Sequence, residues 1–192
     1  MGKSTASGIF RRARIPVFDA DHAVHALQAL GGRAVRPIAA AFPGTVRNGR
    51  VDRGALRAAV LGDPAGLLRL EAIIHPLVRQ AEQAFLRRAR RAGARVAVLD
   101  IPLLLETGGA ERVDLVLVVS APRAVQMDRV RRRRHMSDAQ IAAVLARQMP
   151  DGEKRRRADV VVHTGLSRRH AQSQLQRLIK GVVSDRRWRV GA

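Results

Sequence analysis

The sequence contains no cysteine, few aromatic residues and no long apolar run. The absence of cysteine excludes disulfides, thiolate metal sites and thiol catalysis. Aromatic side chains make up 3% of the 192 residues, which leaves few rings on which nucleic-acid bases could stack. No apolar segment approaches the roughly 20 residues of a membrane-spanning helix, and the N-terminal residues lack the apolar stretch of a secretory signal. We therefore expect a cytoplasmic protein that does not span a membrane.

Acidic residues are scarce relative to basic ones. The 36 Lys and Arg residues against 16 Asp and Glu residues give a formal net charge of +20. Such a charge is typical of nucleic-acid-binding proteins. The basic residues, however, are spread over predicted helices without interleaved aromatic side chains, and the richness in Ala, Arg, Gly and Val favours a codon bias as the cause. We therefore expect no nucleic-acid partner, although a polyanionic small molecule would be attracted to this surface.

The first five residues match the last part of a phosphate-binding P-loop, G-x-x-x-x-G-K-[ST]. In a complete loop, backbone N–H groups surround the phosphates, the Lys reaches the β- and γ-phosphates, and the Ser or Thr hydroxyl binds Mg²⁺. Gly2, Lys3, Ser4 and Thr5 would supply the second half of such a loop. A match of four residues also occurs by chance, so the rest of the chain has to decide between the two interpretations.

Apolar runs of strand length alternate with segments of helical periodicity along the chain. Strands are predicted over residues 15–18, 95–99, 113–119 and 159–162, and helices over 4–12, 19–30, 121–132, 137–148 and 167–183. Residues 31–91 are expected to form several helices separated at proline and glycine residues, with one turn at Asn48-Gly49. The run 113–119 is almost continuously apolar, as in a parallel strand that is covered on both faces. This alternation predicts a three-layer α/β fold with a doubly wound parallel sheet.

Acidic residues follow two of the predicted strands. Asp19 and Asp21 come after the first strand, and Asp100 and Glu106 after the second. Ligands bind at the carboxyl ends of the strands in such sheets, and phosphoryl transfer needs an acidic group that orients or deprotonates the attacking hydroxyl. Asp19 is equally well explained as a helix N-cap. Because one cap needs only one Asp, Asp21 is the stronger candidate for a functional group.

Several segments, taken in order, carry a resemblance to a known family, the dephospho-coenzyme A kinases. The resemblance covers nearly the whole chain, and its segments are Gly2 to Thr5, Ile15 to Asp21, Gly49 to Arg53 with Leu56, Leu70 to Pro76, Asp100 to Glu106, Ala146 to Met149, and Lys154 with Ala158 to Val162.

The resemblance implies Mg²⁺-dependent transfer of the γ-phosphoryl group of ATP to the ribose 3′-hydroxyl of dephospho-coenzyme A, the last step of coenzyme A biosynthesis. It implies catalytic roles for Lys3, Asp19, Asp21 and Arg133, with Ser4 and Asp19 supporting the metal. The implied ATP-binding residues are Gly2, Lys3, Ser4, Thr5, Arg133, Arg147 and Thr164, and the implied substrate-binding residues are Asp21, Asp52, Arg53, His75, Pro102 and Glu106.

The resemblance also implies how the single domain is organised. The core would comprise residues 1–30, 93–120 and 158–192, the helical substrate-binding insertion residues 31–92, and a lid residues 121–157. His75-Pro76 would lie where the insertion returns to the core, as a helix-breaking pair or as a ligand contact. The lid arginine is assigned to Arg133 within the run 131–134, with Arg147 or Lys154 in support. A monomer is expected.

The front of the chain departs from the family pattern. Met1 aligns just before the final Gly-Lys of the P-loop, so the first strand of the sheet and the initial glycines of the loop are not in the sequence. We expect that the start codon lies upstream; a truncated, inactive product is the other explanation, and under either this chain alone would bind ATP poorly. A basic nucleic-acid-associated α/β protein, or a related kinase that acts on another nucleoside or nucleotide, are the alternative functions.

Overall fold

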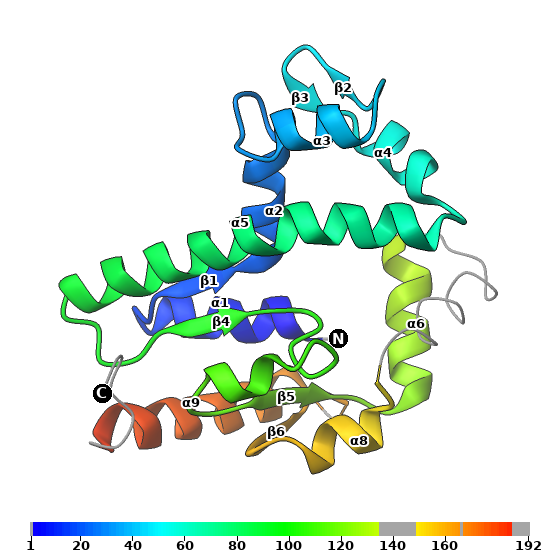
Figure 1. Ribbon diagram of the computed structural model, residues 1–192. Coiled ribbons are helices and arrows are strands. Elements are labelled where there is room, and N and C mark those ends of the chain that lie inside the picture. Colours follow the sequence, from blue (N-terminus) through cyan, green and yellow to red (C-terminus); the bar gives the residue numbers. More distant parts are fainter. Residues whose placement is uncertain (1, 135–148, 166, 186–192) are drawn as a thin grey trace. The chain divides into compact units, whose positions relative to one another are not determined.

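The computed structural model describes residues 2–134, 149–165 and 167–185 (Figure 1). The chain forms two compact units, one made of residues 1–17 and 94–192 and the other of residues 18–93. The first unit contains both helices and strands, and the second consists mainly of helices. None of the helices in the described ranges is long and apolar enough to cross a membrane.

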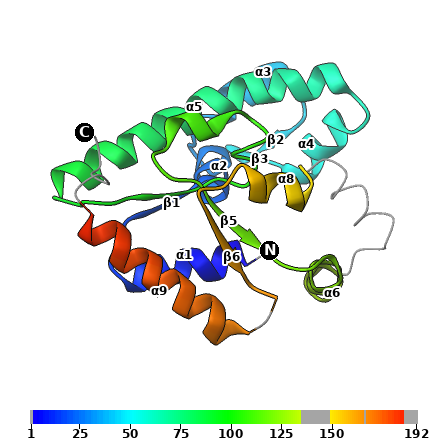
Figure 2. The same ribbon diagram turned by 90° about the horizontal axis from the view of Figure 1, so that it is seen from below.

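The first unit is built on two parallel strands, β5 (Leu117–Ser120) and β6 (Val160–His163). Leu117 lies opposite Val160, and the register continues to Ser120 opposite His163. On one face, Leu117 and Val119 belong to a core that contains residues of α1 (Lys3–Arg12) and α9 (Arg168–Ser184). Figure 2 shows both helices on the same side of the two strands.

The opposite face of β5 packs against different elements. Val116 and Val118 form a second cluster with Leu105, to which Met149 and Ala158 contribute. The short 3₁₀ helix η1 (Gly109–Arg112) and α8 (Asp151–Arg156) belong to this region of the chain. The strand is thus buried on both faces, and the helix–strand–helix layering predicted from its apolar run is confirmed.

The strand β4 (Val98–Asp100) also belongs to the first unit. The Val98 N–H donates to the Pro16 carbonyl over 2.9 Å, directly before β1 (Val17–Asp19). Val98 and Leu117 pack against the same core of α1 and α9. The helix α6 (Arg123–Arg134) follows β5.

The second unit is helical apart from one hairpin. Four helices, α2 (Ala20–Gln28), α3 (Val35–Ala41), α4 (Arg53–Val60) and α5 (Pro64–Arg91), enclose a core that includes Leu27, Ile38, Phe42, Leu56 and Ile74. The strands β2 (Val46–Arg47) and β3 (Arg50–Val51) pair antiparallel. Asn48 and Gly49 connect them with φ angles of 50° and 70°, as a two-residue turn of type I′ requires. The turn predicted from Asn48-Gly49 is confirmed.

The helix α5 corrects one expectation. It runs through Pro76 without interruption (Figure 1), whereas a break was expected at the His75-Pro76 pair. An interior proline costs a helix about 3 kcal/mol. Ile74 is buried and Ile73, Leu77 and Val78 pack against the same core. Burial of each such side chain contributes about 1.5–3 kcal/mol, so packing around the proline outweighs its cost.

The other predicted elements are found within a few residues of their expected ends. The strand expected at residues 95–99 is β4, the one at 159–162 is β6, and the helix at 167–183 is α9. The helix predicted over 137–148 lies outside the described residues. The two compact units divide the chain after residues 17 and 93, and the insertion predicted from the resemblance covers residues 31–92.

Candidate phosphate-binding site

The N-terminus of α1 is preceded by a glycine whose conformation and surroundings exclude a larger residue. Gly2 has a φ of 110°. A Cβ atom at this position would meet Cγ1 of Val119 at 2.9 Å and Cγ2 of Thr164 at 3.1 Å. Gly2 therefore lies tightly between the ends of β5 and β6. The first backbone N–H groups of a helix have no intrahelical partner and carry a partial positive charge, which makes this end suitable for phosphate.

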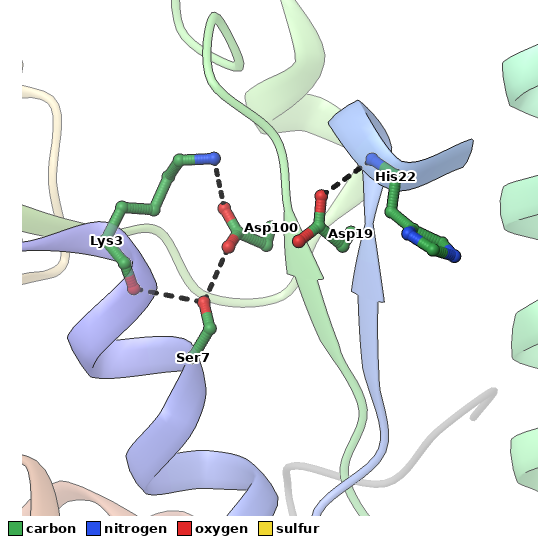
Figure 3. Close-up of polar contacts among 5 residues, drawn as sticks. All are labelled: Lys3, Ser7, Asp19, His22 and Asp100. Carbon is green, nitrogen blue, oxygen red and sulfur yellow. Dashed lines mark hydrogen bonds and ion pairs between the residues drawn. The ribbon is translucent and has the colours of Figure 1, made fainter. Parts of the chain in front are cut away.

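Lys3 is held by a buried carboxylate at the end of β4. Its Nζ atom lies 2.6 Å from Oδ1 of Asp100 (Figure 3). The Lys3 side chain is 40% exposed, whereas that of Asp100 is 4% exposed. The Lys3 side chain is thus partly exposed, while its partner is buried.

Ser7 contacts the other oxygen of the same carboxylate. Its hydroxyl lies 2.6 Å from Oδ2 of Asp100 and 3.1 Å from the Lys3 carbonyl (Figure 3). Oδ1 of Asp100 is buried and has no hydrogen bond of good geometry, although the Lys3 ammonium is in ion-pair distance. The contact between Lys3 and Asp100 is therefore an ion pair without a well-directed hydrogen bond. One orientation of the carboxylate therefore serves two different partners.

The carboxyl ends of β5 and β6 are joined by Thr164. Its N–H and its hydroxyl both donate to the Ser120 carbonyl, over 2.8 and 3.1 Å. Because Thr164 also lies next to Gly2, the structure brings it to the N-terminus of α1. Thr164 is the one predicted nucleotide contact outside residues 2–5 whose side chain is described.

The two aspartates after β1 occupy different positions on α2. Asp19 is its N-cap, with Oδ1 accepting the His22 N–H over 3.0 Å (Figure 3). Asp21 lies exposed in the first turn. The N-cap role expected for Asp19 is confirmed, and Asp21 stays the candidate for the functional group.

Glu106 forms a clamp with two groups that follow far along the chain. Its Oε1 accepts the Lys154 ammonium over 2.8 Å and the Met149 N–H over 3.1 Å. Burial disfavours the charged form of Glu106, but the hydrogen bonds from Lys154 and the backbone, together with the Lys154 charge, outweigh it and lower the pKa of Glu106. A second contact, from Ser120 Oγ to Asp151 Oδ2 over 2.8 Å, also fixes α8. Glu106 thus holds the backbone before α8 and a side chain within α8.

Asp52 is the N-cap of α4. Its Oδ1 accepts the N–H groups of Gly54 and Ala55, each over 3.0 Å. The hydrogen bond from Ala55 is the largest influence on the pKa of Asp52, which is lowered despite some desolvation. Arg53, His75 and Pro102 are exposed, and the first two lie on α4 and α5.

The predicted lid residues are described only in part. The backbone of Arg133 lies in the last turn of α6. Arg147 lies outside the described residues. Lys154, named in support of them, is engaged by Glu106.

The donor groups at the start of α1 fit Mg²⁺ in the form that accompanies a nucleotide. Mg²⁺ usually keeps several waters and uses one or two protein oxygens together with substrate phosphates. The hydroxyl of Ser4, an exposed residue in the first turn of α1, is such an oxygen, whereas Oδ1 of Asp100 is occupied by the Lys3 ammonium. Within the described ranges, no group of three or more His, Asp or Glu residues forms an all-protein metal cage.

Asp100 and Ser7, which contact each other and lie next to Lys3, were not assigned a role from the sequence. Asp100 was recognised as a strand-end carboxylate without a role, and Ser7 carried no signal. The position of Asp100 at a strand end, downstream of a Gly-Lys-Ser, is the signal that points to it. Ser7 lies four residues after Lys3 and therefore on the same face of α1.

Known proteins resemble this chain over most of its length. The sequence model of the family Dephospho-CoA kinase matches residues 1–168. The chain is 61% identical over 155 residues to the dephospho-CoA kinase of Paramagnetospirillum magneticum. The aligned residues make up 81% of this chain and 73% of the relative. It is 54% identical over 186 residues to that of Mesorhizobium japonicum, covering 97% and 93% of the two chains.

Solved structures are similar as well. TT1252 from Thermus thermophilus has a TM-score of 0.83 at 31% identity, covering 96% of this chain and 93% of that one. A dephospho-CoA kinase from Campylobacter jejuni has a TM-score of 0.70 at 22% identity and supports the fold alone. The resemblance found in the sequence, the α/β fold and the assignment as a kinase are confirmed. The chain therefore belongs to the dephospho-CoA kinase family.

Proposed function

We propose the residue roles through which this ATP-dependent kinase phosphorylates the ribose 3′-hydroxyl of dephospho-CoA. The observation that carries the proposal is the partly exposed Lys3 side chain at the N-terminus of α1, whose ammonium pairs with the buried Asp100. Phosphoryl transfer depends on positioning and on neutralisation of charge, and both are available at this end of the helix.

Lys3 and the first turn of α1 bind the phosphates of ATP. The Lys3 side chain turns from Asp100 to the β- and γ-phosphates, while the N–H groups of residues 3–5 donate to phosphate oxygens. Gly2 allows the close approach because it has no side chain, and Thr164 lies beside it on the nucleotide side.

Asp21 receives the proton of the attacking hydroxyl. As that proton moves to its carboxylate, the ribose 3′-oxygen forms a bond to the γ-phosphorus, and the bond from the γ-phosphorus to the bridging oxygen breaks to release ADP. Asp19 caps α2 and so fixes the backbone that carries Asp21. An exposed carboxylate in the first turn of a helix is accessible to a substrate hydroxyl.

Ser4 would hold Mg²⁺ with the support of Asp19, and the ion would supply neutralisation of phosphate charge. Arg133 and Arg147 add positive charge next to the transferred group. The chemistry of Ser4 supports the metal assignment, because its hydroxyl is exposed at the first turn.

Exposed side chains bind the acceptor. Arg53 and His75 are exposed on α4 and α5, and a guanidinium suits the pyrophosphate of dephospho-CoA. Pro102 is exposed after β4. Asp21 contacts the ribose, and Asp52 and Glu106 contribute through the backbone that their carboxylates hold. We place the enzyme in the cytoplasm as a monomer.

The proposal is tested with protein produced from its full reading frame. Purified enzyme is incubated with Mg²⁺-ATP and dephospho-CoA, and the product is identified by mass and by the position of the new phosphate. Parallel reactions contain adenosine, AMP and other nucleosides as acceptors. A folded protein that prefers one of these acceptors contradicts the proposed substrate-binding residues.

A further inference from the structure

Ser7 is buried in the second turn of α1 and has two acceptors within reach. Its relative exposure is 4%, whereas Ser4 and Thr5 in the turn before it are exposed. A hydroxyl has one hydrogen to donate. The contact to Oδ2 of Asp100 is 0.5 Å shorter than the contact to the Lys3 carbonyl (3.1 − 2.6 Å), and its acceptor is charged. The hydrogen therefore belongs to the carboxylate.

This hydrogen bond determines which oxygen of Asp100 faces Lys3. Because Oδ2 is taken by Ser7, Oδ1 is the atom that lies 2.6 Å from the ammonium. Oδ1 has no directed hydrogen bond of its own in the described structure. Among the described residues, the Ser7 hydroxyl and the Lys3 ammonium are thus the groups that contact the buried carboxylate.

The two partners of Asp100 differ in what they have to do during binding. Lys3 must contact ATP phosphates, whereas Ser7 is fixed in a helix and stays with the carboxylate. A buried carboxylate that loses a partner carries a desolvation penalty. If Ser7 were absent, Asp100 would depend on Lys3 alone and would hold it more strongly against the phosphates.

We propose that Ser7 is a positioning residue of the ATP site, whose hydrogen bond to Asp100 Oδ2 keeps the carboxylate satisfied and so releases Lys3 to the phosphates of ATP. This role rests on the phosphate-binding function of Lys3 proposed above. It assigns a function to a side chain that does not touch the nucleotide. Ser7 and Asp100 are separated by 93 residues, so the contact joins α1 to β4 through one hydroxyl.

The test measures Mg²⁺-ATP binding by calorimetry and steady-state kinetics in the full-length protein. Ser7→Ala is expected to weaken ATP binding about tenfold, the usual size of one hydrogen bond to a charged group. The KM for ATP rises with it, while the KM for dephospho-CoA stays within about twofold. A purely structural role would instead lower the unfolding temperature and leave the dissociation constant of the folded protein unchanged.

Two further variants connect the effect to Asp100. In an Asp100→Asn background, where no charge holds Lys3, Ser7→Ala is expected to change ATP affinity by less than about twofold. Ser7→Thr keeps a hydroxyl and is expected to recover affinity to within about threefold of the parent. Ser184→Ala is the matched control: like Ser7, Ser184 has the carbonyl four residues earlier within reach, at 2.7 Å, but the described structure gives it no carboxylate partner.

Three results would overturn the proposal. The first is ATP affinity of Ser7→Ala within twofold of the parent, and the second is an undiminished loss in the Asp100→Asn background. The third applies if the Asp100→Asn protein binds ATP too weakly to measure. In that case Ser7→Thr decides, and a loss of ATP affinity equal to that of Ser7→Ala overturns the proposal. A parent protein that binds no ATP contradicts the role of Lys3 and, with it, the role of Ser7. If the parent binds ATP and only the Ser7 variants depart from the expected affinities, the role of Ser7 alone is contradicted.

Discussion

The pair of Lys3 and Asp100 has the character of a functional contact. A buried charge pair is weak evidence for stability, because desolvation offsets much of the attraction. Asp100 is almost fully buried and Lys3 is partly exposed, so the pair presents one cation outward. This asymmetry suits a lysine that exchanges its carboxylate for phosphate.

Replacement of Lys3 by methionine should abolish most of the activity. We expect turnover to fall about 100- to 1000-fold, since one preorganised charge at the transferred group is removed. Asp100 would lose a partner, so the free energy of unfolding should fall by about 1–3 kcal/mol. Initial rates and urea unfolding measure the two effects. Lys180→Met, on the exposed side of α9, is the control and should match the parent; equal turnover of the two variants would contradict the role of Lys3.

Substitution of Asp19 and substitution of Asp21 should lower turnover to different extents. Asp21→Asn is expected to lower turnover about 100-fold or more while ATP binding is kept, because it removes the proton acceptor. Asp19→Asn keeps a good N-cap, so α2 should stay intact and turnover should fall less. Single-turnover rates and nucleotide calorimetry on both variants decide the matter. The assignment is wrong if Asp19→Asn loses the chemical step and Asp21→Asn retains it.

At the scale of elements, α8 is held in place by the clamp of Glu106 and Lys154. The pKa of Glu106 is lowered, so the ionised form is favoured by folding. A lowered pKa in the folded state contributes stability that is present above the unfolded pKa, whose ordinary value is 4.5, and is lost as pH falls through the folded pKa.

Glu106→Gln should therefore destabilise the protein in a pH-dependent way. At pH 7 we expect a loss of about 1–3 kcal/mol in the free energy of unfolding, the value of a partly buried charged hydrogen bond. The difference from the parent should shrink below pH 4.5. Glu153→Gln is the matched control, because its 2.6 Å pair with Arg157 on the same helix is more exposed and should contribute about 0.5 kcal/mol or less. A difference independent of pH would argue against the clamp.

The proline within α5 gives a prediction about stability alone. Pro76→Ala restores a backbone donor, which is worth up to about 3 kcal/mol in a helix interior, while the unfolded chain gains entropy worth about 1 kcal/mol. A net stabilisation of about 2 kcal/mol is expected in urea unfolding. Pro64→Ala at the start of the same helix removes a proline where no donor is needed, and it should give no gain. If Pro76→Ala destabilised the protein instead, the packing of α5 would depend on the proline, and the prediction would be wrong.

The elements differ in how far the sequence predicts them. Residues 113–119 predict a strand covered on both faces because their apolar run is itself the consequence of that burial, and Asn48-Gly49 predicts its turn because few residues adopt positive φ. Continuation of α5 through Pro76 was not predictable from local propensity, since packing with three other helices decides it. The contact between Ser7 and Asp100 depends on how β4 lies against α1, and no local pattern reports it.

At the scale of the whole molecule, the net charge of +20 raises the question of nucleic-acid binding. The chain has few aromatic side chains for stacking, and its family phosphorylates a small anionic substrate. We expect no tight binding of RNA or duplex DNA at physiological salt, and weak binding at low salt that disappears as counterions are added. Fluorescence anisotropy across a salt series measures this. Binding in the nanomolar range at physiological salt would contradict the expectation.

In the proposed function, Lys3, the first turn of α1 and the aspartates after β1 act in the transfer of phosphate from ATP to dephospho-CoA. The most direct measurement is the rate of CoA formation from Mg²⁺-ATP and dephospho-CoA by the full-length protein, with parent, Lys3→Met and Asp21→Asn compared at equal folded concentration. The account predicts CoA phosphorylated at the ribose 3′-position, with turnover lost in both variants and ATP binding retained in Asp21→Asn. A folded parent that forms no CoA, or variants as active as the parent, would contradict it.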